Sequence, residues 1–248
     1  MMPYLYIVLP SYGVMAFLGF LAAVILLFFR LDKYEISFRK FIKLLLICAT
    51  GCFIGSKMLY AVTRIPELVS DFSFMKLIML VPSSGYVFYG GLFGVIFGIV
   101  FYSRKDKVLR KKLFDFAVPA FPLFHAFGRI GCMLAGCCYG IQLKNPIGIE
   151  GVIYFYRLPV PLIESVFEFV LFGVLLFIQH KAKEMDILKI YLISYSLFRF
   201  GNEFFRGDDI RGIWFGLSTS QWISIIIVCS CCFMIFKKNI NTNVEYNL

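Results

Sequence analysis

Charged residues are scarce in this chain. Asp, Glu, Lys and Arg make up 16% of its 248 residues, whereas 60% of the residues are hydrophobic. A soluble domain of ordinary composition carries about 25% charged and about 45–50% apolar residues. The composition therefore argues against an ordinary soluble domain, because one core of this size cannot bury so much apolar side chain. It indicates that lipid is the solvent for much of the surface.

The sequence also lacks the features of a cleaved signal peptide, of a repeat protein and of a low-complexity chain. The first ten residues lack a charged n-region, and no small-residue cleavage site follows the first apolar run, so we expect a retained helix there rather than a cleaved signal. The sequence shows no internal repeat and no low-complexity segment. Connectors between apolar segments are too short for a separate soluble domain. We expect residues 1–248 to form one transmembrane domain, with a disordered polar tail at 239–248.

Apolar segments of membrane-spanning length recur along the chain. A helix needs roughly 20 mostly apolar residues to cross a bilayer. Pro119, Pro122 and several glycines interrupt the fourth segment, and a membrane helix tolerates such breaks where neighbours satisfy the freed backbone groups. The sequence predicts an all-α, polytopic integral membrane protein with about seven spans. These segments are 12–29, 41–62, 85–102, 113–135, 160–179, 187–205 and 217–236.

The distribution of positive charge sets the expected orientation. The net charge of +10 would suit a nucleic-acid partner, but the basic residues form short clusters between apolar segments, so we expect no nucleic acid partner. Most Lys and Arg follow the first, third, fifth and seventh segments. Because cytoplasmic connectors are rich in Lys and Arg, the C-terminus is expected in the cytoplasm and the N-terminus outside.

Ionisable residues occur within the expected spans, where each is a hypothesis for a functional site. Arg199, Glu203 and Arg206 fall on one helical stripe because they are four and three residues apart. Arg129 lies on the fourth segment and Glu164 on the fifth. Arginine binds phosphate through paired donors, so Arg129 and Arg199 predict a pocket for an anionic lipid headgroup near the outer leaflet. The alternative is a structural row of ion pairs whose arginines reach lipid phosphates.

The segment at 125–140, HAFGRIGCMLAGCCYG, contains His125 and three cysteines, Cys132, Cys137 and Cys138. A zinc or iron–sulfur site is disfavoured because no C-x₂-C pair is present. A redox-active thiol pair facing the oxidising side is a second interpretation. The third, which the sequence favours, is that these are small packing residues in a glycine-rich hairpin. We therefore expect no cofactor and no bound metal.

Two tyrosine–glycine motifs open expected spans on the outer side. Tyr89 precedes the pair Gly90 and Gly91, and Tyr12 precedes a single glycine. Glycines let a ligand or another backbone approach closely. A tyrosine at this depth is either a ligand contact or an interfacial anchor.

Taken together, these motifs resemble those of the prolipoprotein diacylglyceryl transferases of bacterial inner membranes. The segment at 198–206, FRFGNEFFR, is similar to that family's F-R-x-x-x-E-F-F-R. The segment GRIGCMLAGCCYG at 128–140 resembles its signature G-R-x-x-N-F-x-N-G-E-x-x-G, and RLPVPLIE at 157–164 resembles R-H-P-x-Q-L-Y-E. The Tyr-Gly motifs, the segment 51–60, DFAVP at 115–119 and SQWIS at 220–224 extend the resemblance over nearly the whole chain.

The resemblance implies a multi-pass enzyme of the bacterial inner or plasma membrane. Such an enzyme moves the diacylglyceryl group of phosphatidylglycerol to the lipobox cysteine thiol of a prolipoprotein at the outer face and leaves glycerol 1-phosphate. Its implied partners are phosphatidylglycerol, the prolipoprotein signal-peptide region and the bilayer.

The resemblance also implies roles for individual residues. Arg129 and Arg199 would hold the phosphate, and Glu203 would orient Arg199 or the headgroup. Tyr89 stands at a histidine position but is a poor base, because its unperturbed pKa is about 10. His125 is the expected substitute base. The residues expected to bind substrate are Tyr12, Gly90, Gly91, Cys132, Cys137, Gly140, Glu164 and Arg206.

The chain departs from the family pattern around this arginine–glutamate set. Cys132 and Ala135 replace asparagines, and Cys137 replaces a glutamate; Tyr89 replaces histidine, and Pro161 replaces glutamine, while Lys57 replaces arginine. Other functions therefore stay open. They are a family paralogue with a different acceptor, a membrane thiol-redox enzyme that uses Cys132, Cys137 and Cys138, and a non-catalytic lipid-binding homologue.

Overall fold

The computed structural model describes residues 4–5, 9–63, 87–149, 153–181, 186–208 and 212–246, most of which are helical. This confirms the prediction of an all-α chain. The strands in the described residues form three short antiparallel pairs. They are β1 (Tyr4–Leu5) with β2 (Leu9–Pro10), β3 (Gln142–Ile149) with β4 (Ile153–Arg157), and β5 (Ile213–Trp214) with β6 (Leu217–Ser218).

The chain divides into two compact units, Met1–Leu26 with Val118–Leu248, and Leu27–Ala117. The helices of the first unit are the start of α1 (Ser11–Phe29), α7 (Ala120–Ala135), α8 (Val160–Lys181), α9 (Ile187–Asn202) and α10 (Thr219–Tyr246).

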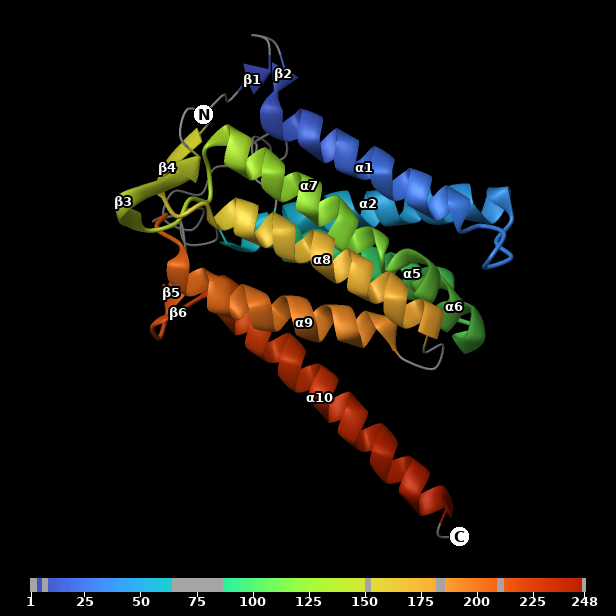
Figure 1. Ribbon diagram of the computed structural model, residues 1–248. Coiled ribbons are helices and arrows are strands. Elements are labelled where there is room, and N and C mark those ends of the chain that lie inside the picture. Colours follow the sequence, from blue (N-terminus) through green and yellow to red (C-terminus); the bar gives the residue numbers. More distant parts are fainter. Residues whose placement is uncertain are drawn as a thin grey trace, which may run out of the picture. The chain divides into compact units, whose positions relative to one another are not determined.

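Within the first unit, α7 packs on α8, α8 on α9, and α9 on α10. Figure 1 shows the β3–β4 hairpin between α7 and α8 and the β5–β6 hairpin between α9 and α10, both at the same end of these helices. The last turns of α7 and α9 and the first turns of α8 and α10 therefore meet at that end. Side chains from four helices can converge there.

The second unit contains α2 (Phe38–Thr63), α5 (Phe88–Tyr102) and α6 (Lys107–Ala117). The helices α2 and α5 approach through glycines. A Cβ added at Gly51 or Gly55 would collide with the backbone of Gly94 or Gly90. Small residues permit such close packing of membrane helices, where van der Waals contact replaces the hydrophobic effect.

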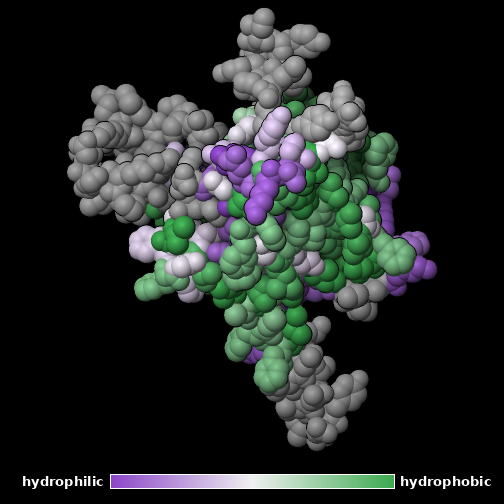
Figure 2. All heavy atoms as spheres, turned by 60° about the vertical axis from the view of Figure 1, so that its left-hand side comes forward, coloured by the Kyte–Doolittle hydropathy of each residue, from purple (hydrophilic) through white to green (hydrophobic). Residues whose placement is uncertain are grey.

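Large apolar side chains are exposed on the outside of the helices, whereas the charged side chains of the arginine–glutamate set are buried. Phe97 and Phe233 are 69% and 67% exposed, whereas Arg199 and Glu164 are 3% and 1% exposed. Figure 2 shows apolar side chains over most of the visible surface and hydrophilic ones in separate groups. This distribution is the reverse of that in a soluble protein. Together with the apolar helices, it identifies the chain as a membrane protein.

Five helical segments in the described residues are long and apolar enough to cross a membrane, and one of them comprises both α6 and α7: Ser11–Phe29, Phe38–Val62, Lys107–Ala135, Val160–Lys181 and Thr219–Lys237. The predicted third and sixth spans correspond to shorter helices, α5 with 15 residues and α9 with 16. Residues 85–86 of the predicted third span lie outside the described residues. The count of seven spans and the orientation stay predictions.

Two predicted segments differ in detail from the structure. The fourth divides at Pro119 into α6 and α7, because proline cannot continue the hydrogen bonds of a helix interior. The sixth ends as the 3₁₀ helix η1 (Glu203–Phe205). The tail at 239–248, which we expected to be disordered, is helical as far as Tyr246, since α10 continues into it.

Candidate active site

A buried carboxylate from α8 lies between two arginines from different helices. Glu164 Oε1 is 3.0 Å from Arg129 Nη2 on α7, and Glu164 Oε2 is 3.5 Å from Arg199 Nη1 on α9. Tyr195 Oη donates a hydrogen bond of 3.1 Å to Glu164 Oε1. Two guanidinium groups therefore converge on the two oxygens of one anion. Buried charges persist only when they are paired and hydrogen-bonded in this way.

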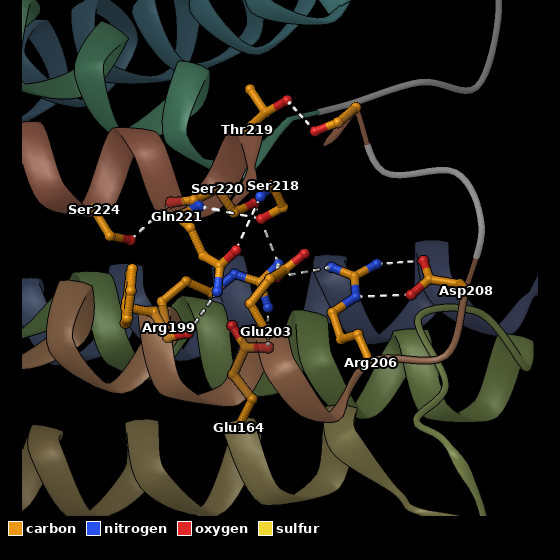
Figure 3. Close-up of polar contacts among 12 residues, drawn as sticks. Glu164, Arg199, Glu203, Arg206, Asp208, Ser218, Thr219, Ser220, Gln221 and Ser224 are labelled. Atoms are coloured by element: carbon orange, nitrogen blue, oxygen red, sulfur yellow. Dashed lines mark hydrogen bonds and ion pairs between the residues drawn. The ribbon is translucent and has the colours of Figure 1, made fainter. Parts of the chain in front are cut away.

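The end of α9 continues this row of alternating charges. Arg199 Nη2 lies 2.5 Å from Glu203 Oε2, and Arg206 Nη1 lies 3.8 Å from the same oxygen. Arg206 also forms a two-pronged pair with Asp208, in which Nε donates to Oδ1 at 2.8 Å and Nη2 pairs with Oδ2. Figure 3 shows the row from Glu164 to Asp208. The predicted stripe forms, and Asp208, which the sequence did not single out, closes it.

Burial and pairing act in opposite directions on Arg206. Burial by itself lowers the pKa of the Arg206 guanidinium. The hydrogen bonds with Asp208 and the nearby negative charges of Glu203 and Asp208 outweigh it, so the pKa is raised above the ordinary arginine value. Arg206 is therefore a permanent positive charge at this end of the site.

His125 is held on both ring nitrogens. Arg129 Nε donates to His125 Nε2 at 3.1 Å, and His125 Nδ1 lies 2.7 Å from Glu168 Oε1. Because Nε2 accepts from arginine, its lone pair is occupied, and the hydrogen-bond pattern assigns the ring hydrogen to Nδ1, facing Glu168. In this geometry the Nε2 lone pair of His125 faces Arg129, and the expectation that His125 is the general base stays a prediction. Residue spacing does not indicate Glu168 as a partner of His125, because the pairing crosses from α7 to α8.

The start of α10 supports α9. Ser220 Oγ accepts a hydrogen bond of 3.3 Å from Arg199 Nη2, and Ser224 Oγ donates to Ser220 O at 2.8 Å. Gln221 Nε2 donates to Phe200 O at 3.4 Å. The polar residues of the SQWIS motif at 220–224 thus hold the end of α9 and one of its arginines in place (Figure 3).

The C-terminal end of α7 folds back on itself. Cys137 N donates to Cys132 O and Gly136 N to Met133 O, both at 3.1 Å, and Gly136 adopts φ 73°. This is the Schellman arrangement, in which a left-handed glycine lets the chain reverse over the last helical turn. Cys138 follows with φ 57°. The reversal brings the Sγ atoms of Cys132, Cys137 and Cys138 within 4.8 Å of one another.

This thiol cluster lies beside the arginines. Hydrogen bonds with Cys132 and Cys137, together with the positive charges of Arg129 and Arg206, lower the pKa of the Cys138 thiol.

The loop that follows the cysteines is fixed to its neighbours, because Gly140 pairs with Arg206 in an isolated β-bridge and Gly140 N donates to Leu158 O at 2.9 Å. A Cβ at Gly140 would lie 2.6 Å from that carbonyl oxygen, so a side chain there would displace the loop.

The remaining predicted residues fall in both units. Tyr12 packs against Gly131 in the first unit, where a Cβ on the glycine would lie 3.2 Å from Tyr12 Cα. Tyr89, Gly90 and Gly91 belong to α5 of the second unit. There Gly90 and Gly91 lie against α2, and Tyr89 is buried and stacks on Phe93.

Known proteins similar to this chain share most of its length. The family model of prolipoprotein diacylglyceryl transferases matches residues 3–237. A phosphatidylglycerol–prolipoprotein diacylglyceryl transferase of Clostridium tetani is 34% identical over 88% of each chain. One of Clostridium perfringens is 36% identical over 88% of this chain and 86% of the relative. A protein of the same name from Dehalococcoides mccartyi is 26% identical over 97% of this chain and 94% of its own.

Proposed function

Because the chain belongs to the prolipoprotein diacylglyceryl transferase family, we propose that it transfers the diacylglyceryl group of phosphatidylglycerol to a cysteine thiol of a prolipoprotein. Its relatives carry that activity in their names. The protein is a membrane transferase, and we place it as a multi-pass protein in the bacterial inner membrane. Its charged cluster then faces the outer leaflet, where the lipid headgroup and a secreted acceptor meet.

The observation that carries this proposal is the convergence of Arg129 and Arg199 on Glu164. Two guanidinium groups held by one carboxylate are close enough to share another oxyanion of similar size. Each guanidinium has five N–H donors, and the contacts of Arg129 described here use only Nε and Nη2. Donors thus remain for a phosphate oxygen at the edge of the cluster.

The chemistry needs positive charge at the leaving group. The acceptor sulfur attacks the terminal glyceryl carbon, a C–S bond forms, and the C–O bond to phosphate breaks. The bonding electron pair leaves with glycerol 1-phosphate, whose phosphate gains negative charge. Fixed donors in a site of low dielectric constant stabilise that charge more than water does. Arg129 and Arg199 are the donors we assign to this task, and Glu203 orients Arg199.

The buried carboxylates have a preparatory role in this mechanism. Glu164 holds both arginines in position before the lipid arrives, and His125, tied to Glu168, orients Arg129. Other assignments rest on the family resemblance and are part of the same proposal. They are hydrogen bonding by Tyr89 and substrate binding by Tyr12, Gly90, Gly91, Cys132, Cys137, Gly140 and Arg206.

A transfer assay tests the proposal. The purified full chain in phosphatidylglycerol vesicles should convert a lipobox peptide into its diacylglyceryl thioether, detected by mass spectrometry. Arg129→Ala and Arg199→Ala should each lower turnover by about 10²–10³-fold, the usual cost of removing one fixed donor from a charge-stabilising site. Arg39→Ala, an exposed arginine on α2, is the matched control and should leave turnover unchanged.

Complementation separates the proposal from its alternatives. The wild-type chain should restore growth to a bacterial strain depleted of its own transferase, and Arg199→Ala should not. A chain that binds phosphatidylglycerol but neither forms thioether nor restores growth would be a non-catalytic homologue, and the proposal would be wrong.

A further inference from the structure

Three thiols of the first unit occupy the geometry of a metal site. The Sγ atoms of Cys132, Cys137 and Cys138 all lie within 4.8 Å of one another. Tetrahedral zinc–thiolate bonds of about 2.3 Å place neighbouring sulfurs about 3.8 Å apart. Small side-chain rotations, with no change of backbone, would therefore bring all three sulfurs onto one ion.

The backbone explains why this cluster forms without a C-x₂-C pair. In a Schellman reversal the residue after the left-handed glycine packs over the residue that begins the last turn of the helix. Here those two residues are Cys137 and Cys132, and the left-handed Cys138 continues the reversal toward them. The spacing C-x₄-C-C thus brings sulfur atoms together, as C-x₂-C does in a zinc knuckle.

Two arginines lie beside the sulfurs of such a site. Three thiolates and one divalent ion have a net charge of −1. Arg129 interacts electrostatically with Cys132 and Cys138, and Arg206 interacts with Cys138. Two fixed cations therefore lie close enough to the sulfurs to offset part of the negative charge of a thiolate–metal site.

The cluster also has one open side. Cys132 is buried and Cys138 is half-buried, whereas Cys137 is exposed. Closed zinc sites use four protein ligands, and catalytic zinc sites use three and leave the fourth position to water or substrate. Three thiols beside two arginines therefore match a site that binds a further ligand.

We propose that Cys132, Cys137 and Cys138 bind one thiophilic divalent ion such as zinc, and that its fourth position takes the cysteine thiol of the acceptor. This inference rests on the proposed transferase function. The acceptor thiol would lose its proton to solvent on the exposed side as the metal–sulfur bond forms. The metal-bound thiolate would then attack the glyceryl carbon while the electron pair of the breaking C–O bond leaves with glycerol phosphate. The thioether product is a weaker ligand and would dissociate.

A metal at this site would also activate the acceptor thiol, for which the arginine cluster has no group. The reaction must remove a thiol proton, and His125 is occupied by Arg129 and Glu168. A metal deprotonates a thiol that coordinates it, so a separate general base becomes unnecessary. Cys132 and Cys137 stand where the family pattern has asparagine and glutamate. In this proposal they activate the acceptor thiol through the metal.

Metal binding can be measured without substrate. The full chain, purified in detergent under reducing conditions and stripped with a chelator, should take up one zinc per chain by elemental analysis. Cobalt(II) should give a thiolate-to-metal charge-transfer absorption. Cys132→Ser and Cys137→Ser should each weaken zinc binding by more than about 100-fold, since even an outer-shell partner is worth about 10–100-fold. Cys229→Ser, an exposed cysteine on α10, is the control and should bind as wild type.

The exposed position of Cys137 keeps the test decisive, because Cys137→Ser is expected to fold even if the buried Cys132→Ser does not. The metal site is wrong if wild type binds no stoichiometric zinc, if the triple serine variant binds it equally well, or if two of these cysteines form a disulfide in anaerobically prepared protein. If zinc binds but chelated and zinc-loaded protein transfer equally fast, the fourth-position role is wrong and the transferase proposal stands. If zinc binds and the loaded protein transfers nothing, the metal site stands and the proposed transferase function fails.

Discussion

At the scale of single residues, Glu164 determines whether the arginine cluster can exist. It is 1% exposed and compensates two guanidinium groups that are themselves buried. Removing one partner of a buried ion pair leaves an uncompensated charge, which costs more than the pair contributes. The stability of the first unit and the geometry of its site thus depend on the same carboxylate.

We expect Glu164→Gln to lower the free energy of unfolding by about 3–5 kcal/mol, because Arg129 and Arg199 would face a neutral amide. Denaturant titration of the full chain in detergent, followed by circular dichroism, measures this. Glu35→Gln is the matched control. Glu35 is exposed and pairs with Lys112 at 3.0 Å, and such surface pairs contribute about 0–1 kcal/mol. Equal effects of the two substitutions would show that Glu164 does not compensate the arginines.

A second residue-scale prediction concerns His125. His125→Gln keeps an acceptor for Arg129 Nε, whereas His125→Ala removes it, so the glutamine variant should retain more transferase activity. The pH–rate profile of His125→Gln should keep the shape of the wild-type profile, because a positioning residue does not transfer the proton. A profile that loses its acidic limb, with both variants equally inactive, would show that His125 is the base after all.

At the scale of elements, glycines decide how closely helices approach. In the second unit α2 and α5 meet at backbone distance, and a Cβ at Gly94 would collide with the carbonyl of Gly51. On α8, by contrast, nothing lies within 4 Å of a Cβ added at Gly173. Close packing thus requires glycine at position 94 but not at position 173.

This contrast predicts opposite effects of the same substitution. Gly94→Ala should destabilise the chain by about 1–3 kcal/mol, the usual cost of overpacking. Gly173→Ala should leave stability unchanged or raise it by up to about 1 kcal/mol, because alanine is the better helix former. Thermal unfolding of both variants in detergent compares them. A harmless Gly94→Ala would mean that α2 and α5 do not touch at these glycines.

At the scale of the whole molecule, the seven spans expected from the sequence and its positive-inside distribution predict a C-terminus in the cytoplasm. A green fluorescent protein fused after residue 248 should fluoresce, and alkaline phosphatase at the same place should be inactive. A membrane-impermeant maleimide should label Cys137 from outside intact cells, with Cys137→Ser as the control. An active phosphatase fusion, or labelling of Cys137 only after lysis, would contradict the expected orientation.

The sequence by itself determined what depends on composition and on spacing along one helix. Scarce charge and long apolar segments identified a membrane protein, and helical periodicity placed Arg199, Glu203 and Arg206 on one stripe. Ordered motifs indicated the family to which the chain belongs. These properties are local, because a neighbour three or four residues away follows from the 3.6-residue turn.

Only the tertiary structure decided which residues from different helices meet. It placed Glu164 between Arg129 and Arg199, and it paired His125 with Glu168 and Arg129. It also gathered three thiols whose spacing alone argued against a metal site. Contacts of this kind depend on how α7, α8 and α9 pack and on a left-handed turn at Gly136. Neither can be read from residue spacing, because both arise where the chain leaves one helix and returns against another.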